Sequence, residues 1–200
     1  AEFLRGLRAL CDARGLLLFF DEVQCGLGRT GDWCGWRSIA PDVEPDGVSW
    51  AKGIANGFPL GAFWAGRKDA GGTPLCDILG PGTHGTTYGG NPVSCAAGLA
   101  VLHVIERDDL LAHARKMGAL LTDLLRPNIP AGATVRGLGL MIGIALPESH
   151  AARDFVIRLQ DLGLLAIPAG ERVVRLLPPL NVREDEIREA AEIIARAANN

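Results

Sequence analysis

The chain has 200 residues, of which 48% are apolar and 22% are charged, and its formal net charge is −3. Abundant apolar residues with few charges exclude a disordered chain, and the length suffices for a real core. The charge gives no basic field for nucleic acid, and no apolar run approaches the roughly 18 residues of a membrane span. We therefore expect a folded protein with neither nucleic acid nor a membrane as partner.

The predicted elements of the first part alternate between helix and strand. Residues 3–14 follow an amphipathic helical pattern, and residues 16–20 form an apolar run typical of a strand buried on both faces of a parallel sheet. Residues 47–51 and 61–65 are predicted as two further buried strands. Residues 67–91 are rich in Gly, Pro and Thr and predict a long loop, of a length that is usually functional.

The second part changes character after two predicted helices, at residues 91–106 with Asn91 as N-cap and at residues 110–125. Short strands are then predicted at residues 134–136, 140–146, 164–167 and 173–177, and helices at residues 149–162 and 184–197. We place a boundary near residues 127–131. The prediction is an α/β protein with a larger domain at residues 1–128 and a smaller α/β domain at residues 129–200.

The cysteines indicate the cellular compartment of the protein, and the first residues indicate whether the chain is part of a longer one. Five cysteines without a C-x-x-C pair indicate neither a disulfide framework nor a zinc site, so we expect free thiols, no metal and a cytoplasmic location. The N-terminus has no signal-peptide pattern. Residues 1–4 lack a starting Met and read as the middle of a helix, so we expect a piece of a longer protein.

Two carboxylates, Asp21 and Glu22, directly follow the first apolar run. In open α/β sheets, ligands bind beyond the carboxyl ends of the strands. A half-buried carboxylate at that edge needs a cation or several hydrogen bonds. A structural ion pair with a residue such as Arg29 is the alternative, and this feature alone does not decide between the two.

Lys52 closes the second predicted strand, inside the apolar, glycine-rich stretch of residues 47–66. We expect it to be poorly solvated there, and desolvation favours the neutral amine. A neutral amine at a strand end is a nucleophile that can form a Schiff base. The alternative is a lysine whose amine extends to the surface.

Residues 81–92, with the sequence PGTHGTTYGGNP, lead straight into a predicted helix. Hydroxyl groups and free amides beside glycines suit a phosphate, and the helix terminus adds its dipole. A solvated loop is the alternative, but the length and the position before a capped helix favour a binding site.

Residues 26–31, GLGRTG, match the G-x-G-x-x-G pattern of dinucleotide sites. The context disagrees, because the pattern does not follow the strand closely and two carboxylates would face the pyrophosphate. Residues 32–41 also make a poor crossover helix, since they contain Gly35 and Pro41. A nicotinamide dinucleotide is therefore the less favoured ligand.

An acid at one strand end, a lone lysine at another and a phosphate-binding loop together suit pyridoxal phosphate. The lysine would hold the aldehyde, and the acid would keep the pyridine nitrogen protonated. The amine of Lys52, once released by substrate, would act as general base and then as general acid.

Several segments resemble the class III aminotransferases of the ornithine type (subgroup II), and most closely their acetylornithine branch. They are residues 18–31 (LFFDEVQCGLGRTG), 51–53 (AKG), 57–62 (GFPLGA), 84–92 (HGTTYGGNP), 136–143 (RGLGLMIG) and 175–180 (RLLPPL). The resemblance implies fold type I of the pyridoxal-phosphate enzymes, with part of the large, mainly parallel-sheet domain and the small C-terminal domain. It also implies amino transfer between an N-acetylornithine-like ω-amine and 2-oxoglutarate or glutamate, in arginine biosynthesis.

The resemblance assigns roles around the cofactor. Lys52 would be the Schiff-base lysine and Asp21 the partner of the pyridine nitrogen, which makes both catalytic. Glu22, Val23 and Gln24 would belong to the cofactor site, with Val23 packed on the ring and Gln24 bonded to the cofactor's hydroxyl.

The resemblance also implies a homodimer. Thr87 would bind the phosphate of the neighbouring subunit's cofactor, and Thr86 would lie close to the substrate there. Arg175 would face a substrate carboxylate, since a planar guanidinium suits bidentate binding.

Family members are far longer than this chain, and their N-terminal half carries the other phosphate-binding loop, a stacking aromatic and a substrate-binding arginine. We therefore expect the chain to be the C-terminal half, with little or no activity alone. The alternatives are another ornithine or ω-amino acid transaminase, a semialdehyde aminomutase, or a non-catalytic fragment that serves as a folding or dimer partner.

Overall fold

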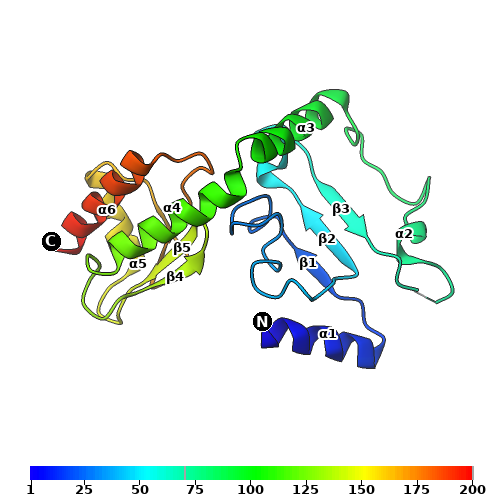
Figure 1. The fold of residues 1–200 in the computed structure, drawn as a ribbon, viewed down its shortest axis with the longest axis horizontal. Helices are drawn as coiled ribbons and strands as arrows, with labels where there is room; N and C mark the ends of the chain where they lie inside the picture. The colour runs from blue at the N-terminus through cyan, green and yellow to red at the C-terminus, as the bar shows by residue number, and fades with distance from the viewer. Residues whose placement is uncertain (70, 200) are drawn as a thin grey trace. The chain divides into compact units, whose positions relative to one another are not determined.

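The computed structural model describes residues 1–69 and 71–199, which form two compact units. The N-terminal unit contains residues 1–27 and 32–108, and the C-terminal unit contains residues 28–31 and 109–200 (Figure 1). The sequence placed the boundary near residues 127–131, whereas the structure divides before helix α4 (Leu110–Leu125). The reason is packing, because the buried side of α4 belongs to the core of the C-terminal unit.

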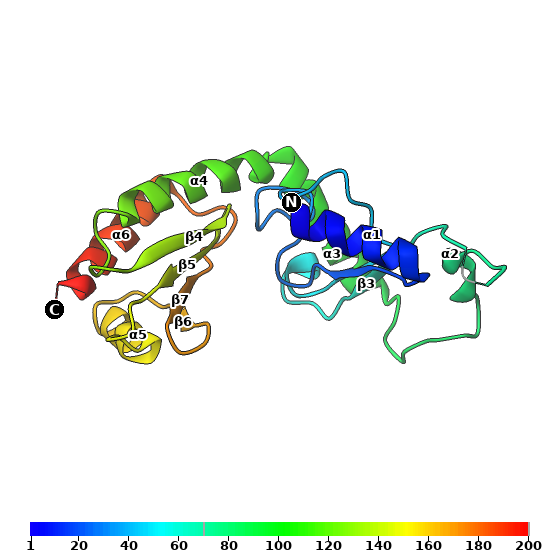
Figure 2. The ribbon, with the colours of Figure 1, turned by 90° about the horizontal axis from the view of Figure 1, so that it is seen from below.

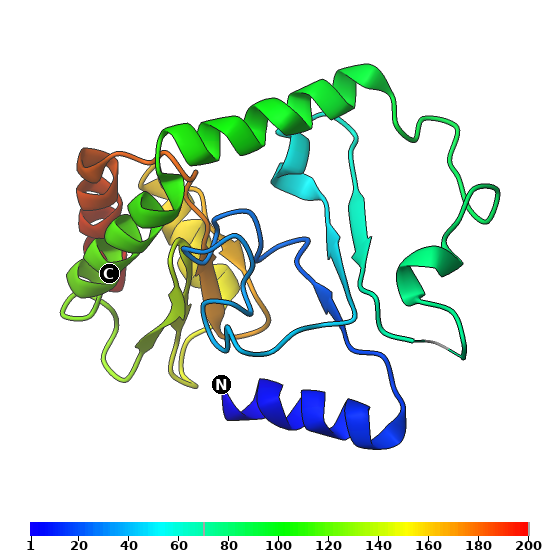
Figure 3. The same ribbon diagram turned by 45° about the vertical axis from the view of Figure 1, so that its right-hand side comes forward.

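The N-terminal unit is built on a three-stranded sheet of β1 (Phe19–Asp21), β2 (Gly47–Trp50) and β3 (Ala62–Ala65). β1 and β2 are parallel, and β3 is antiparallel to β2. Figure 3 shows the three strands side by side. All three lie where the sequence predicted strands, although β1 begins later than the apolar run from which it was predicted.

The prediction that the first strand is buried on both faces is wrong for the described residues. Leu16 and Leu17 precede β1 and are exposed, and Phe19 keeps 48% of its surface exposed. Phe63 of β3 is 51% exposed and contacts Phe19, with ring centroids 5.8 Å apart. Both rings therefore stay about half exposed, and the apolar run is only partly buried.

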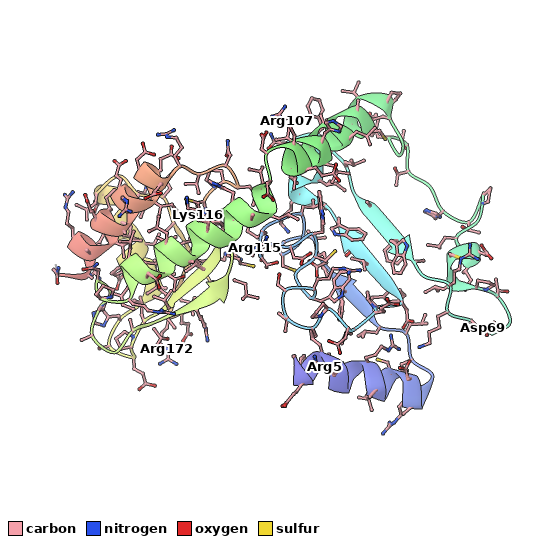
Figure 4. The ribbon with its side chains drawn as sticks, in the orientation of Figure 1. Arg5, Asp69, Arg107, Arg115, Lys116 and Arg172 are labelled. Carbon is pink, nitrogen blue, oxygen red and sulfur yellow. The ribbon has the colours of Figure 1, made fainter. Side chains whose placement is uncertain are left out.

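Helix α1 (Glu2–Arg14) is joined to the sheet through Asp46, which directly precedes β2. The buried Asp46 carboxylate accepts hydrogen bonds from the Leu18 amide at 2.7 Å and from Arg8 of α1 at 2.9 Å. Arg5, labelled in Figure 4, projects from the same helix and pairs with the exposed Asp42 at 2.7 Å. These bonds connect three segments of the N-terminal unit that are distant in the sequence.

The remaining elements of this unit are the 3-10 turn η1 (Lys52–Ala55) and helices α2 (Leu75–Ile78) and α3 (Pro92–Arg107). The connection from β3 to α3 is long, and its described residues include the short α2, as Figure 3 shows. Helix α3 begins as predicted, since the Asn91 side chain accepts the Ser94 amide at 2.9 Å. It packs against η1, and a Cβ added at Gly98 would lie 3.5 Å from the Ile54 carbonyl oxygen of η1 and 2.7 Å from Leu60 Cδ2.

The C-terminal unit has an antiparallel sheet in the order β4 (Thr134–Leu138), β5 (Met141–Ala145), β7 (Val173–Leu176), β6 (Ile167–Pro168). Alternate residues of the two central strands are buried on one face, where they meet α4, α5 (Ala152–Asp161) and α6 (Glu184–Ala198). Figure 2 shows α4 and α6 running side by side along this sheet. Among the described helices, none combines the length and the hydropathy that a membrane-spanning segment requires.

Residues 28–31 are a strap that belongs to the C-terminal unit although the chain on either side belongs to the other. The Leu140 amide donates to the Arg29 carbonyl at 2.9 Å, and the Arg29 guanidinium donates back to the Leu140 and Pro178 carbonyls. Arg115 of α4, labelled in Figure 4, donates to the Gly31 carbonyl. The dinucleotide-like motif is therefore a packed structural segment, and no helix follows it in residues 32–40.

Candidate active site

The carboxyl ends of β1 and β2 bring Asp21 and Lys52 to the same edge of the sheet. The register pairs Asp21 with Ser49, and Lys52 follows Ser49 by three residues. Parallel strands lie about 4.8 Å apart, so Asp21 is close to Ser49, and Lys52 begins η1 two residues after β2 ends. Flexible side chains of this length can therefore reach one small ligand between them.

The Asp21 carboxylate is exposed and held in a local turn. Its Oδ1 atom accepts the Val23 amide at 3.0 Å, and among the described residues it forms no ion pair. Arg29, the partner considered from the sequence, donates to two carbonyl groups of the C-terminal unit instead. The structural ion pair is therefore absent from the described residues, and Asp21 keeps an oxygen for a ligand.

Lys52 is exposed, which contradicts the expectation of a poorly solvated amine. The segment around it is open, because Gly53 and Gly57 carry no side chain and an added Cβ at either would meet nothing within 4 Å. Lys52 begins η1 with a φ of 49°, a left-handed conformation that is uncommon for a side-chain-bearing residue and typical of functional positions. In the described chain its amine has neither an ion pair nor a hydrogen bond.

Glu22 points away from this edge and is only 3% exposed. Its carboxylate accepts the backbone amides of Gly35 at 2.7 Å and Trp36 at 3.2 Å. Val23 and Gln24 follow in a half-buried turn that the Gly26 amide closes onto the Glu22 carbonyl at 3.0 Å. The sequence reasoning expected a cation or several hydrogen bonds for a carboxylate at this edge but did not identify these two amides as the partners of Glu22.

Two thiols lie beside Glu22 and are held in the neutral form. Burial, followed by the negative charge of Glu22, raises the pKa of Cys25 to about 12. The same two causes raise the pKa of Cys34 to about 11. Neither thiol is therefore a competing nucleophile at neutral pH, because the thiolate is the reactive form.

The predicted phosphate loop is open to solvent, since residues 81–90 are all exposed. The Gly89 amide donates to the Thr86 carbonyl at 3.2 Å, which turns the chain before α3. Within the described chain the Thr87 hydroxyl has no hydrogen bond, so it is available to a ligand. The loop offers donors but does not close around a site of its own.

Arg175 lies on β7 in the C-terminal unit, on the sheet face opposite the core. The cross-strand register places it in one row with Gly143 and Arg136. Gly143 has no side chain, so Arg136 and Arg175 flank a position that carries none. A planar guanidinium group suits carboxylate binding.

Comparison with known proteins gives the family. The profile described as aminotransferase class-III matches residues 1–198. The chain belongs to the class-III aminotransferase family. It is 45% identical over 197 residues to acetylornithine aminotransferase 1 of Bordetella bronchiseptica, a match that covers 96% of this chain and 47% of that protein. Acetylornithine aminotransferase of Bacillus subtilis is 41% identical, with 98% and 49% covered.

Solved structures assign the same fold to this class-III aminotransferase chain. Ornithine δ-aminotransferase of Plasmodium falciparum superposes with a TM-score of 0.87 at 30% identity, covering 99% of this chain and 51% of that one. Acetylornithine aminotransferase of Elizabethkingia anophelis gives 0.84 at 32% identity, covering 98% and 51%. The predicted fold type I is confirmed, and the chain spans about half the length of the relatives that it matches.

Proposed function

We propose that this chain carries the lysine-bearing part of a pyridoxal-phosphate-dependent aminotransferase. The observation that carries the proposal is the meeting of Asp21 and Lys52 at the ends of two adjacent parallel strands, with neither side chain ion-paired in the described chain. A carboxylate and an amine that form no ion pair at a sheet edge fit this cofactor's ring nitrogen and aldehyde.

Each residue would have a distinct part in the reaction. When bound, pyridoxal phosphate supplies an aldehyde that accepts the amino group and a protonated ring that withdraws electrons. Asp21 would keep the proton on the ring nitrogen, and Lys52 would hold the cofactor through its amine. Once the substrate has displaced Lys52, the free Lys52 amine would take the proton from the amine-bearing carbon of the substrate as general base. It would then return that proton as general acid. Val23 and Gln24 would contact the ring and its hydroxyl.

The substrates we propose are an N-acetylornithine-like ω-amine and 2-oxoglutarate or glutamate, as in arginine biosynthesis in the cytoplasm. The high identity to acetylornithine aminotransferases supports this choice over other ω-amino acid transaminases and the aminomutase. Arg175 would bind a substrate carboxylate with its planar fork. The exposed Thr86 and Thr87 would complete the site of a second copy, as a homodimer requires.

We propose that the activity needs more polypeptide than these residues provide. Phe19 and Phe63 stay about half exposed on the sheet, and the chain spans about half the length of its relatives. We therefore expect this chain alone to show little or no transamination, even where Lys52 reacts with the cofactor.

Lysine labelling tests the proposal. The chain has three lysines, Lys52, Lys68 and Lys116, so Lys68 and Lys116 serve as internal controls. After incubation with pyridoxal phosphate and reduction with borohydride, peptide mass spectrometry should find the added mass at Lys52 in preference to the other two. Asp21→Asn should reduce this preference. Equal labelling of all three lysines would contradict the proposal and favour a non-catalytic fragment.

A further inference from the structure

Glu22 is a buried carboxylate that accepts two backbone amides and lies beside two thiols. It is 3% exposed, and among the described residues no lysine or arginine forms an ion pair with it. The Gly35 and Trp36 amides supply two hydrogen bonds to its two oxygens. Burying a carboxylate without a cation is unfavourable unless hydrogen bonds satisfy it, so these amides determine where Glu22 lies.

The surroundings of Glu22 leave little freedom. An added Cβ at Gly35 would lie 3.0 Å from Cys25 Cβ and 3.2 Å from a Glu22 carboxylate oxygen. At Gly26, it would lie 2.9 Å from the Glu22 carbonyl and 3.0 Å from Trp50 Cδ1. The side chain and the backbone of Glu22 therefore both have close neighbours, and these contacts fix the turn after β1.

The buried position of Glu22 also constrains Asp21, the residue before it. The Glu22 amide donates to the Ser49 carbonyl at 2.9 Å, which extends the pairing of β1 with β2 beyond Asp21. Successive side chains of a strand point to opposite faces, so a buried Glu22 requires Asp21 to face outward. The Asp21 carboxylate then bonds to the Val23 amide, on the other side of Glu22.

We propose that Glu22 is a positioning residue, whose buried carboxylate fixes the turn after β1 and thereby holds the Asp21 carboxylate at the sheet edge. The inference rests on the proposed function only in that Asp21 is taken as the cofactor's partner. Glu22 thus acts through Asp21, and its carboxylate does not contact the cofactor.

The test compares Glu22→Gln and Glu22→Asp with Glu106→Gln, an exposed glutamate of the same unit that serves as control. Amide hydrogen exchange by NMR reads the contacts without any cofactor. In the wild-type chain the amides of residues 23, 35 and 36 should be protected. Both Glu22 variants should lose protection at residues 35 and 36, and the residue 23 amide should exchange about tenfold faster, as expected for one lost hydrogen bond. The control should match wild type.

Thiol titration separates the effect of the Glu22 charge from the effect of its side-chain length. Glu22→Gln removes the charge and should lower the pKa of Cys25, read as alkylation at lower pH, whereas Glu22→Asp keeps the charge and should stay closer to wild type. If Glu22 acted through packing alone, the pKa of Cys25 would change by the same amount in both variants.

Two results would overturn the inference. One is rapid exchange at residues 35 and 36 in the wild-type chain, which needs no variant to fold. The other is an unchanged residue 23 amide in a folded Glu22 variant that has lost protection at residues 35 and 36. Failure of the Lys52 labelling would reject the cofactor while leaving these exchange results intact, so the two proposals fail separately.

Discussion

Asp46 offers the sharpest test of what holds the N-terminal unit together. Its carboxylate is buried and receives the Leu18 amide at 2.7 Å and the Arg8 guanidinium at 2.9 Å, with the Lys68 amine at 3.6 Å. Asp46→Asn removes the charge while nearly preserving the shape. Breaking a partly buried pair and weakening a charge-assisted hydrogen bond should destabilise the unit by about 2 kcal/mol, because Arg8 retains Asp12 as a second partner.

The effect should depend on pH with a definite sign. Burial acts to raise the pKa of Asp46, but the hydrogen bonds from Leu18 and Arg8 and the charges of Arg8 and Lys68 outweigh it and lower the pKa overall. A folded-state pKa below the unfolded value of about 3.9 stabilises the protein above that pH, and the stabilisation is lost as pH falls through the folded pKa. The difference between wild type and Asp46→Asn should therefore be full at pH 7 and shrink below about pH 4.

Thermal or urea unfolding measures this difference, with an expected fall in Tm of roughly 4–8 °C at pH 7 for a chain of this size. Asp42→Asn is the matched control, since the Arg5–Asp42 pair is exposed and should contribute little. The reasoning is refuted if both variants lose the same stability, or if the gap for Asp46→Asn is undiminished at the acid end.

Three further predictions use other parts of the chain. Asn91→Ala should destabilise the start of α3 by about 1 kcal/mol and Asn91→Ser should restore most of it, measured by urea unfolding. Gly139→Ala should destabilise the C-terminal unit by more than about 2 kcal/mol, because an added Cβ would lie 2.5 Å from the Thr30 carbonyl carbon at a φ of +52°. Gly132→Ala is the control and should cost less stability, because Gly132 has a φ of +82° but room for a Cβ. Equal losses of stability in the two variants would contradict this. Burial and the charge of Glu22 raise the pKa of Cys34 to about 11, so this thiol should resist alkylation at pH 8 until urea unfolds the chain. Rapid labelling of Cys34 in the folded chain would count against its buried position beside Glu22.

Local pattern in the sequence determined the elements of this protein. Helical periodicity placed α1, α4 and α6 within a few residues of their bounds, and Asn91 with Pro92 marked the start of α3. Such signals are readable because capping and amphipathic spacing depend on neighbours within one or two turns. The same local reading put Asp21 and Lys52 at strand ends, and motif resemblance joined them to one cofactor.

Only the tertiary structure decided which residues share a core and which polar groups are satisfied. Helix α4 belongs with the C-terminal unit, residues 28–31 of the GLGRTG motif form a strap within that unit, and Lys52 is exposed although its neighbours are apolar. Glu22 and Asp21 are adjacent in sequence, yet one is buried on backbone amides and the other is open to solvent. Burial and hydrogen-bond partners come from residues far apart along the chain, and the spacing of neighbouring residues does not encode those contacts.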